Sequence, residues 1–213
     1  MPPGRPDRPL TTAVRVPGNL PHRCELHTGQ IFRRPPPDIS LFYAEIPAPT
    51  GQGQRLFADS ASAYDALPNT LKATDGALEG IHAIPGIGRA EYAVKAGETP
   101  KPLLPHQWPQ RQPVVRTHPV TGRRSLYLCE AGQMDWIDGP FVGMEPGPEG
   151  DGAELLYDLM MHRTQPKFTY VHEWHQGDLL IWDNRNLLHC ATWYDAQNHQ
   201  RLMWRTTTRG NPG

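Results

Sequence analysis

The chain has 213 residues, of which 38% are hydrophobic and 20% are charged, and its formal net charge is −1. This length suits one domain with a sizeable core, and the composition is typical of a globular protein rather than a disordered one. The near-neutral charge does not favour a nucleic-acid partner, and the longest apolar runs are too short to cross a membrane.

We expect a single domain over residues 1–213 that starts with a Pro/Arg-rich segment, residues 1–23. The chain contains 24 prolines, about twice the usual share, and proline breaks helices and shortens strands. The three cysteines, Cys24, Cys129 and Cys190, are widely spaced, which argues against a disulfide framework and favours a cytoplasmic location.

The first half of the chain predicts short strands at residues 12–16, 39–46 and 56–58. A helix is predicted over residues 60–67, with Asp59 or Ser60 as its N-cap and Pro68 at its end. Residues 86–112 are rich in Pro, Gly and Gln without a clear period. We expect them to form a mostly irregular segment of the kind often found over an active site.

The second half is more regular. A hairpin is predicted from residues 114–118 and 125–128, and residues 154–162 have leucines at the spacing of an amphipathic helix. Further strands are predicted at residues 169–174, 178–182, 189–194 and 201–208. Short strands at intervals of roughly 10–12 residues, with few helices, favour a mainly β sandwich or jelly roll over an α/β fold.

A polar cluster with a histidine lies between two of these predicted strands. Asp183 and Asn184 are placed to brace a loop, and His189 opens the next strand. A lone histidine is more often structural than a ligand. A ligating imidazole needs a partner for its second nitrogen, so polar neighbours favour a metal site here.

A second histidine, His27, lies near the start of the chain in the sequence Leu26-His27-Thr28-Gly29. Non-haem iron oxygenases commonly bind iron through two histidines and one carboxylate. The first histidine and the carboxylate usually form His-x-Asp or His-x-Glu, and here Gly29 stands at the carboxylate position. The pattern alone therefore does not assign an iron site.

Several stretches resemble the taurine and 2,4-dichlorophenoxyacetate dioxygenase (TauD/TfdA) family. They are LHTGQIF at 26–32, LFADSASAYDAL at 56–67, PVVRTHPVTGRRSLYL at 113–128, DLLIWDNRNLLH at 178–189 and RLMWRTT at 201–207. The likeness extends over residues 24–210. It implies a double-stranded β-helix (jelly roll) fold and a dioxygenase that uses Fe(II) with 2-oxoglutarate as its cosubstrate.

The resemblance also implies roles for individual residues. His27 and His189 match the two iron histidines, and Arg201 matches the arginine that pairs with the distal carboxylate of 2-oxoglutarate. A planar guanidinium suits a carboxylate because it donates two hydrogen bonds at once. Arg205 lies on the same face of the strand and matches the position that holds the acidic group of taurine, although it can equally be a solvated surface arginine.

Two departures from the family pattern bear on the chemistry. Gly29 leaves out the carboxylate ligand, which leaves three alternatives: chloride fills the position and the enzyme halogenates, the site is inactive, or Glu25 replaces the ligand. Arg55 stands where the family has a threonine that helps to bind 2-oxoglutarate. That added cation can pair with a carboxylate or point to solvent.

The expected function is oxygenation of a small, anionic substrate, by hydroxylation or by halogenation. The alternative is a catalytically inactive jelly roll that holds a small acid or another metal. No nucleic-acid or membrane partner is expected, and a homo-oligomer would cover apolar surface that a short N-terminus exposes. Trp108, Trp136 and Phe141 fall in loops that can cover a pocket, although such residues more often pack in a core.

Overall fold

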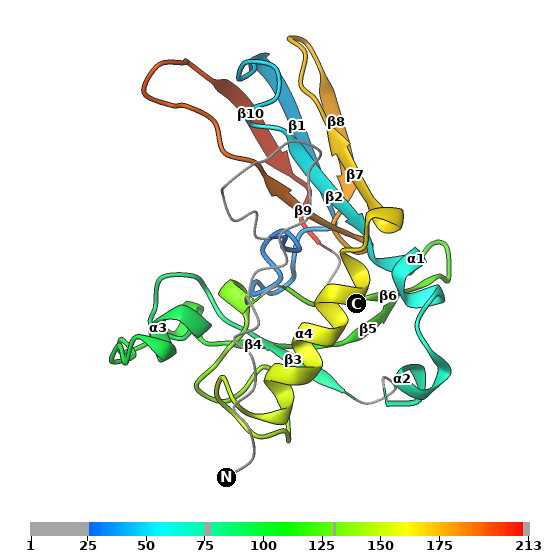
Figure 1. The fold of residues 1–213 in the computed structure, drawn as a ribbon, viewed down its shortest axis with the longest axis vertical. Coiled ribbons are helices and arrows are strands. Elements are labelled where there is room, and N and C mark those ends of the chain that lie inside the picture. The colour runs from blue at the N-terminus through cyan, green and yellow to red at the C-terminus, as the bar shows by residue number, and fades with distance from the viewer. Residues whose placement is uncertain (1–25, 75–77, 130, 211–213) are drawn as a thin grey trace, which may run out of the picture.

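The computed structural model describes residues 26–74, 78–129 and 131–210. The predicted strand at residues 12–16 and the candidate ligand Glu25 lie outside these residues. In the described part, two three-stranded sheets and the longest helix form the frame of the molecule, and both sheets lie toward one end (Figure 1).

The first sheet has the strand order β10-β1-β8 and is antiparallel throughout. Its strands are β1 (Ile39–Ile46), β8 (Leu179–Asp183) and β10 (Leu202–Thr207). In the register, Phe42 of β1 lies opposite Arg205 of β10 and opposite Leu180 of β8. Residues directly opposite one another share a face, so Arg205 projects on the same face as Phe42.

The second sheet has the order β7-β2-β9 and is also antiparallel. Its strands are β2 (Arg55–Asp59), β7 (Thr169–His172) and β9 (Leu187–Ala191). Phe57 lies opposite His189 in the register. Because side chains alternate along a strand, Arg55 shares the face of Phe57 and His189.

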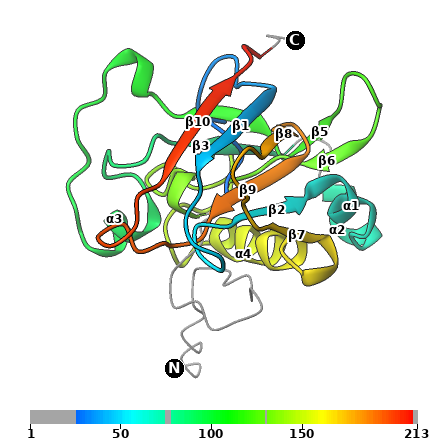
Figure 2. The ribbon, with the colours of Figure 1, turned by 90° about the horizontal axis from the view of Figure 1, so that it is seen from above.

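These sheets and α4 (Asp151–Arg163) form three layers, which Figures 1 and 2 show from two directions. The first core cluster lies between the sheets and consists of Phe42, Ala44, Phe57, Trp174 and Trp182. The larger core includes Leu56 and Leu188 from the opposite face of the second sheet and Leu156 from α4. One face of the second sheet therefore packs on a helix, while the other face looks into the space between the sheets.

The remaining elements surround α4. They are α1 (Ser60–Asp65), α2 (Asn69–Thr74), α3 (Glu91–Lys95), β3 (Glu79–His82), β4 (Gln110–Pro113), β5 (Val115–Thr117), β6 (Arg124–Leu126) and the 3₁₀ turns η1 (Pro105–Gln107), η2 (Ala131–Gln133) and η3 (Pro166–Phe168). The fully buried Arg163 ties α4 to this region, because its guanidinium donates to Ser60 Oγ at 2.6 Å and to Leu128 O at 3.0 Å.

Most of the predicted elements in the described residues are confirmed. The helix predicted at 60–67 ends at Asp65, and the Asp59 carboxylate caps it by accepting from Ala61 N at 3.0 Å. The irregular segment predicted at 86–112 is wrong in part, because it contains α3, η1 and the start of β4. Gln110–Pro113 becomes a strand by pairing with β3, a partner that a local pattern does not reveal.

Two further sequence expectations concern the whole chain. The widely spaced cysteines argued against a disulfide framework, yet Cys190 on β9 is disulfide-bonded. Among the described residues, no helix is both long and apolar enough to span a membrane. The single-domain organisation over residues 1–213 stays a prediction.

Candidate active site

The structure brings the two candidate iron histidines side by side. His27 and His189 form an isolated antiparallel bridge, with His27 N donating to His189 O at 3.0 Å and His189 N donating to His27 O at 2.9 Å. Their imidazole centroids lie 4.6 Å apart. Two candidate ligands from distant parts of the sequence thus meet at the outer edge of the second sheet, along β9.

His189 is a neutral, fully buried imidazole. Burial is the main cause that holds its pKa well below the ordinary value, and the nearby His27 and Arg55 lower it further. Neither ring nitrogen has a hydrogen-bond partner among the described residues. The neutral imidazole is the form that binds a metal ion. The expected brace on a second ring nitrogen is not found in this part of the chain, so the sequence interpretation was wrong on that detail.

Gly29 faces Asn184 and Arg205. A Cβ at this position would lie 2.9 Å from Asn184 Oδ1 and 3.3 Å from Arg205 Nη2. Asn184 is held in place, since it accepts from Trp182 Nε1 at 2.9 Å and donates to Ser40 Oγ at 3.0 Å. Within the described ranges, no group of three His, Cys, Asp or Glu side chains is arranged to hold a metal. The space next to Gly29 therefore contains an amide oxygen and a cation.

The loop between β8 and β9 is fixed by Asp183. Its carboxylate accepts from Arg185 Nη2 at 2.7 Å and contacts His118 Nε2 at 2.8 Å. His118 Nδ1 accepts from Val120 N at 3.2 Å, so Nε2 carries the proton and donates to Asp183. Burial pushes the pKa of Asp183 upward, but hydrogen bonds from Arg185 and His118 outweigh it and hold that pKa below its ordinary value. The sequence predicted the bracing role of Asp183 but not its partners.

Arg55 is buried between the sheets, with only 7% of its surface exposed. Its guanidinium carbon lies 4.8 Å from the centroid of the Phe42 ring and 5.2 Å from that of Trp182. Burial, followed by repulsion from Arg205 and Arg201, lowers the pKa of Arg55 to about 9. Of the two alternatives that the sequence left open, the one in which Arg55 points to solvent is wrong.

Arg201 and Arg205 reach the same space from the other sheet. Arg201 is half-buried, lies 5.9 Å from the Phe42 centroid and donates to Gly53 O at 3.4 Å. Arg205 is exposed and lies 5.9 Å from the Trp182 ring. Among the described residues, none of Arg55, Arg201 and Arg205 forms an ion pair with an acidic side chain. The site is therefore a cluster of cations without a protein counter-ion in this part of the chain.

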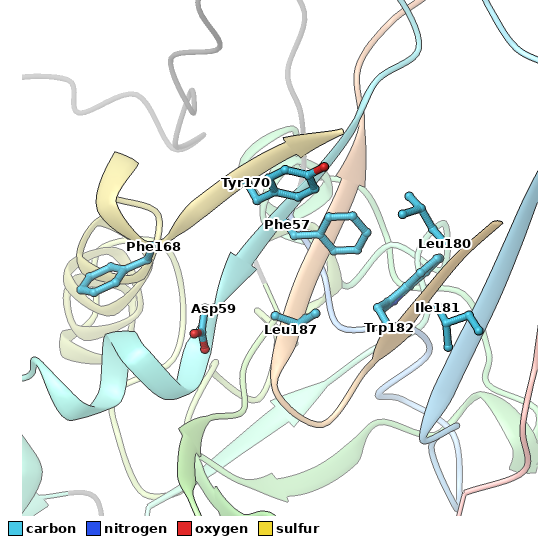
Figure 3. A pocket seen from close by; sticks show the side chains of 8 residues that line it. All are labelled: Phe57, Asp59, Phe168, Tyr170, Leu180, Ile181, Trp182 and Leu187. Atoms are coloured by element: carbon cyan, nitrogen blue, oxygen red, sulfur yellow. The ribbon is translucent and has the colours of Figure 1, made fainter. Parts of the chain in front are cut away.

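A small, mostly apolar cavity lies between residues of the two sheets (Figure 3), and two of its lining rings, Phe57 and Trp182, lie near His189. It has a volume of about 250 Å³ and is lined by Phe57, Asp59, Phe168, Tyr170, Leu180, Ile181, Trp182 and Leu187. The rings of Phe57 and Trp182 meet edge to face, with centroids 5.5 Å apart. The Trp182 ring also lies 4.8 Å from that of His189. These rings form an apolar wall on one side of the site.

A second, larger hollow has a volume of about 920 Å³. It is lined by Phe32, Arg33, Arg34, Pro35, Ile84, Pro105, His106, Trp108, Gln110 and Arg209. Of the three aromatic residues expected in covering loops, Trp108 lines this hollow and is 61% exposed. Trp136 and Phe141 are buried in the larger core, so the alternative that they pack in a core rather than cover a pocket is confirmed for these two residues.

Comparison with known proteins places this chain in a family. The model of the family described as "Taurine catabolism dioxygenase TauD, TfdA family" matches residues 4–207. The chain belongs to the TauD/TfdA family. All five stretches that resembled this family lie in the described residues. Three of them contain His27, His189, Arg201 and Arg205.

Curated relatives and solved structures agree with this membership. The chain is 33% identical over 202 residues to the alpha-ketoglutarate-dependent 2,4-dichlorophenoxyacetate dioxygenase of Burkholderia sp. (strain RASC), covering 93% of this chain and 62% of that protein. It is 34% identical to the (S)-phenoxypropionate/alpha-ketoglutarate-dioxygenase of Sphingobium herbicidovorans, covering 81% of this chain and 58% of that protein. The chain thus spans less than two thirds of the length of these relatives.

The solved structures show the fold. The crystal structure of AAD-2 in complex with Mn(II) and N-oxalylglycine superposes with a TM-score of 0.72 at 36% identity, covering 87% of this chain and 68% of that one. A taurine dioxygenase from Burkholderia xenovorans superposes with a TM-score of 0.68 at 28% identity, covering 88% of this chain and 59% of that one. The predicted mainly β jelly roll with few helices is confirmed.

Proposed function

We propose that this chain is a dioxygenase that depends on Fe(II) and 2-oxoglutarate and acts on a small, anionic substrate. The observation that carries the proposal is the adjacency of His27 and His189, with both nitrogens of the neutral His189 lacking partners in the described chain. A buried imidazole with two unused nitrogens is unfavourable unless a ligand completes it. The relatives named for alpha-ketoglutarate-dependent reactions support the same reading.

The residues present fit the metal and its cosubstrate. His27 and His189 would hold Fe(II), and the oxo-acid end of 2-oxoglutarate would supply the anionic ligands that this pair lacks. Arg201 would hold the distal carboxylate, with Arg55 beside it, because both guanidinium groups are without acidic partners in the described residues. Fe(II) with 2-oxoglutarate and oxygen supplies the oxidation of a C–H bond, which no side chain can perform alone.

The side chains around the pair bind, orient and exclude water. Phe57 and Trp182 pack close to His189 and keep one side of the site apolar. Asp183 holds the loop that leads to His189 in one conformation through its hydrogen bonds. Arg205, which is exposed and faces the site, is proposed to hold the acidic group of the substrate.

We place hydroxylation ahead of halogenation as the reaction. Halogenation requires chloride at the position that the missing carboxylate leaves. A Cβ at Gly29 would already lie 2.9 Å from Asn184 Oδ1, and this oxygen is an acceptor that repels an anion. Arg205 Nη2 lies 3.3 Å from the same point and favours an anion, so a chloride-dependence assay separates the two reactions.

The test is an anaerobic titration of the apo protein with Fe(II) and 2-oxoglutarate, followed by the visible absorption of the chelate. We expect the absorption with the wild-type protein and its loss with His189→Ala. Retention of metal by the His27→Ala, His189→Ala double variant would contradict the proposed ligand pair. No absorption with a folded wild-type protein would favour the alternative of an inactive protein that holds a small acid.

Self-association is a separate part of the proposal. The outer face of the first sheet exposes large apolar side chains, namely Tyr43, Leu179, Ile181 and Trp204. Tyr43 lies opposite Leu179 on one side and opposite Trp204 on the other, so these side chains are neighbours. A contiguous apolar face of this kind is typical of an interface, and we propose that a homo-oligomer covers it. A cytoplasmic location also stays a proposal.

A further inference from the structure

Arg55 is a buried cation that the proposed function does not require. One guanidinium is sufficient to hold one carboxylate through two hydrogen bonds, and Arg201 already stands at the matching position. Arg55 adds a second guanidinium that is 7% exposed and whose Nε has no hydrogen-bond partner in the described chain. A charge in such a place is costly unless an opposite charge accompanies it.

Arg55 and Arg201 approach the same aromatic ring from different sheets. Arg55 is the first residue of β2, and Arg201 directly precedes β10. Their guanidinium carbons lie 4.8 Å and 5.9 Å from the centroid of the same ring, Phe42. The Nε atoms of both arginines are buried and lack partners among the described residues. Both groups therefore lie near Phe42 and each keeps a buried hydrogen-bond donor without an acceptor in the described chain.

The surroundings strengthen this excess of positive charge. Phe42 and Trp182 form apolar walls against Arg55, so little water screens the guanidinium there. Burial, followed by repulsion from Arg205 and Arg201, lowers the pKa of Arg55, in keeping with its position near two other cations. A single carboxylate carries one negative charge and would leave one of the paired guanidinium groups uncompensated.

We propose that Arg55 is a specificity-determining residue that forms a clamp with Arg201 for a distal acid group bearing two negative charges, such as a phosphonate, in preference to a single carboxylate. The inference deepens the proposed function, because it concerns the distal end of the 2-oxo acid that the iron site would bind. A tetrahedral dianion offers three acceptor oxygens, enough to occupy both guanidinium forks at once.

The test compares two ligands of the same length on the metal-free protein. Glutarate ends in a carboxylate, and 4-phosphonobutanoate replaces that carboxylate by a phosphonate. Isothermal titration calorimetry at a pH at which the phosphonate is doubly ionised should show at least about tenfold tighter binding of 4-phosphonobutanoate by the wild-type protein. In Arg55→Thr the preference should fall to about one. An Arg111→Gln variant, which removes an exposed arginine from β4, should keep the wild-type preference.

Two further variants keep the test decisive if Arg55→Thr does not fold. Arg55→Met retains most of the side-chain volume without the charge, and it should also lose the preference. Arg55→Lys retains one charge without the fork, and it should give an intermediate ratio. A wild-type preference near one, or the same preference in wild type and Arg55→Met, would overturn the inference.

A negative result for Arg55 can be told apart from a negative result for the proposed dioxygenase function. These titrations contain no iron, so an Arg55-dependent phosphonate preference stands even if no Fe(II) chelate forms. Conversely, formation of the Fe(II) chelate of 2-oxoglutarate together with equal binding of the two probes would leave the proposed function in place and overturn the role of Arg55.

Discussion

Replacing Gly29 by aspartate restores the acidic side chain of the family pattern. The packing around Gly29 indicates how much folding stability this substitution should cost. A Cβ at this position would lie 2.9 Å from Asn184 Oδ1. Asn184 is 1% exposed and is held by Trp182 Nε1 at 2.9 Å, so it cannot move away without losing that hydrogen bond. We expect Gly29→Ala and Gly29→Asp each to lose about 1–3 kcal/mol of unfolding free energy, the usual cost of overpacking. Calorimetry should show a fall in Tm of about 2–4 °C for each kcal/mol.

The alanine variant is the matched control, because both substitutions add the same Cβ and only one adds a carboxylate. With 2-oxoglutarate present, Gly29→Asp should bind Fe(II) at least about tenfold more tightly than Gly29→Ala, a difference of ~1.4 kcal/mol. Anaerobic calorimetric titration measures both affinities. Equal affinities would refute the assignment of position 29 to the metal site, and an unchanged Tm in Gly29→Ala would refute the packing argument.

Three other predictions concern His82, which is fully buried in β3, the hydrogen bonds of Asp183, and the apolar outer face of the first sheet. Burial, then the charge of Arg163, lowers the pKa of His82 to about 3 from 6.5, so the unfolded chain binds more protons below pH 6.5 and stability falls as the pH falls from 6.5 toward 3. Urea unfolding should show that His82→Leu removes about 2 kcal/mol of the stability difference between pH 6.5 and about pH 5. Asp183→Asn should cost about 1–3 kcal/mol in the same assay and weaken Fe(II) binding, because Arg185 loses the nearer of its two anionic partners and keeps only Asp38 at 3.7 Å. Unchanged binding would show that the brace does not position the site. If the proposed homo-oligomer forms through the first sheet, Trp204→Glu should shift the mass from light scattering toward that of a monomer, and an unchanged mass would exclude this face.

Local sequence patterns predicted most of the described strands and the helices α1 and α4, because these elements have an apolar run, helical spacing or a capping residue. The pair β3 and β4 was missed, since Gly80 and Gln112 are not typical strand residues and become paired only through tertiary contacts. His27 is a similar case. It forms only an isolated bridge, and without the family resemblance nothing in its neighbourhood would have paired it with His189.

The environment of a charged side chain was the least predictable property. Arg55 could equally have faced solvent, and its burial depends on Phe42 and Trp182 from the other sheet. His118 likewise appeared as a hairpin residue, yet it contacts Asp183 at 2.8 Å from a distant part of the sequence. Composition and period carry no information on such contacts, because they arise from the packing of whole layers.

The two departures from the family pattern change the charge of the site in the same direction. Gly29 removes one negative charge, Arg55 adds one positive charge, and the neutral His189 compensates for neither. A divalent cation entering this cluster meets repulsion that only a bound anion can reduce. Metal and acid should therefore bind cooperatively, and by linkage each must raise the affinity of the other by the same factor. It follows that Fe(II) affinity measured without a 2-oxo acid should be weak even in an active enzyme, because at the proposed site the 2-oxo acid would supply the negative charge that Gly29 does not provide.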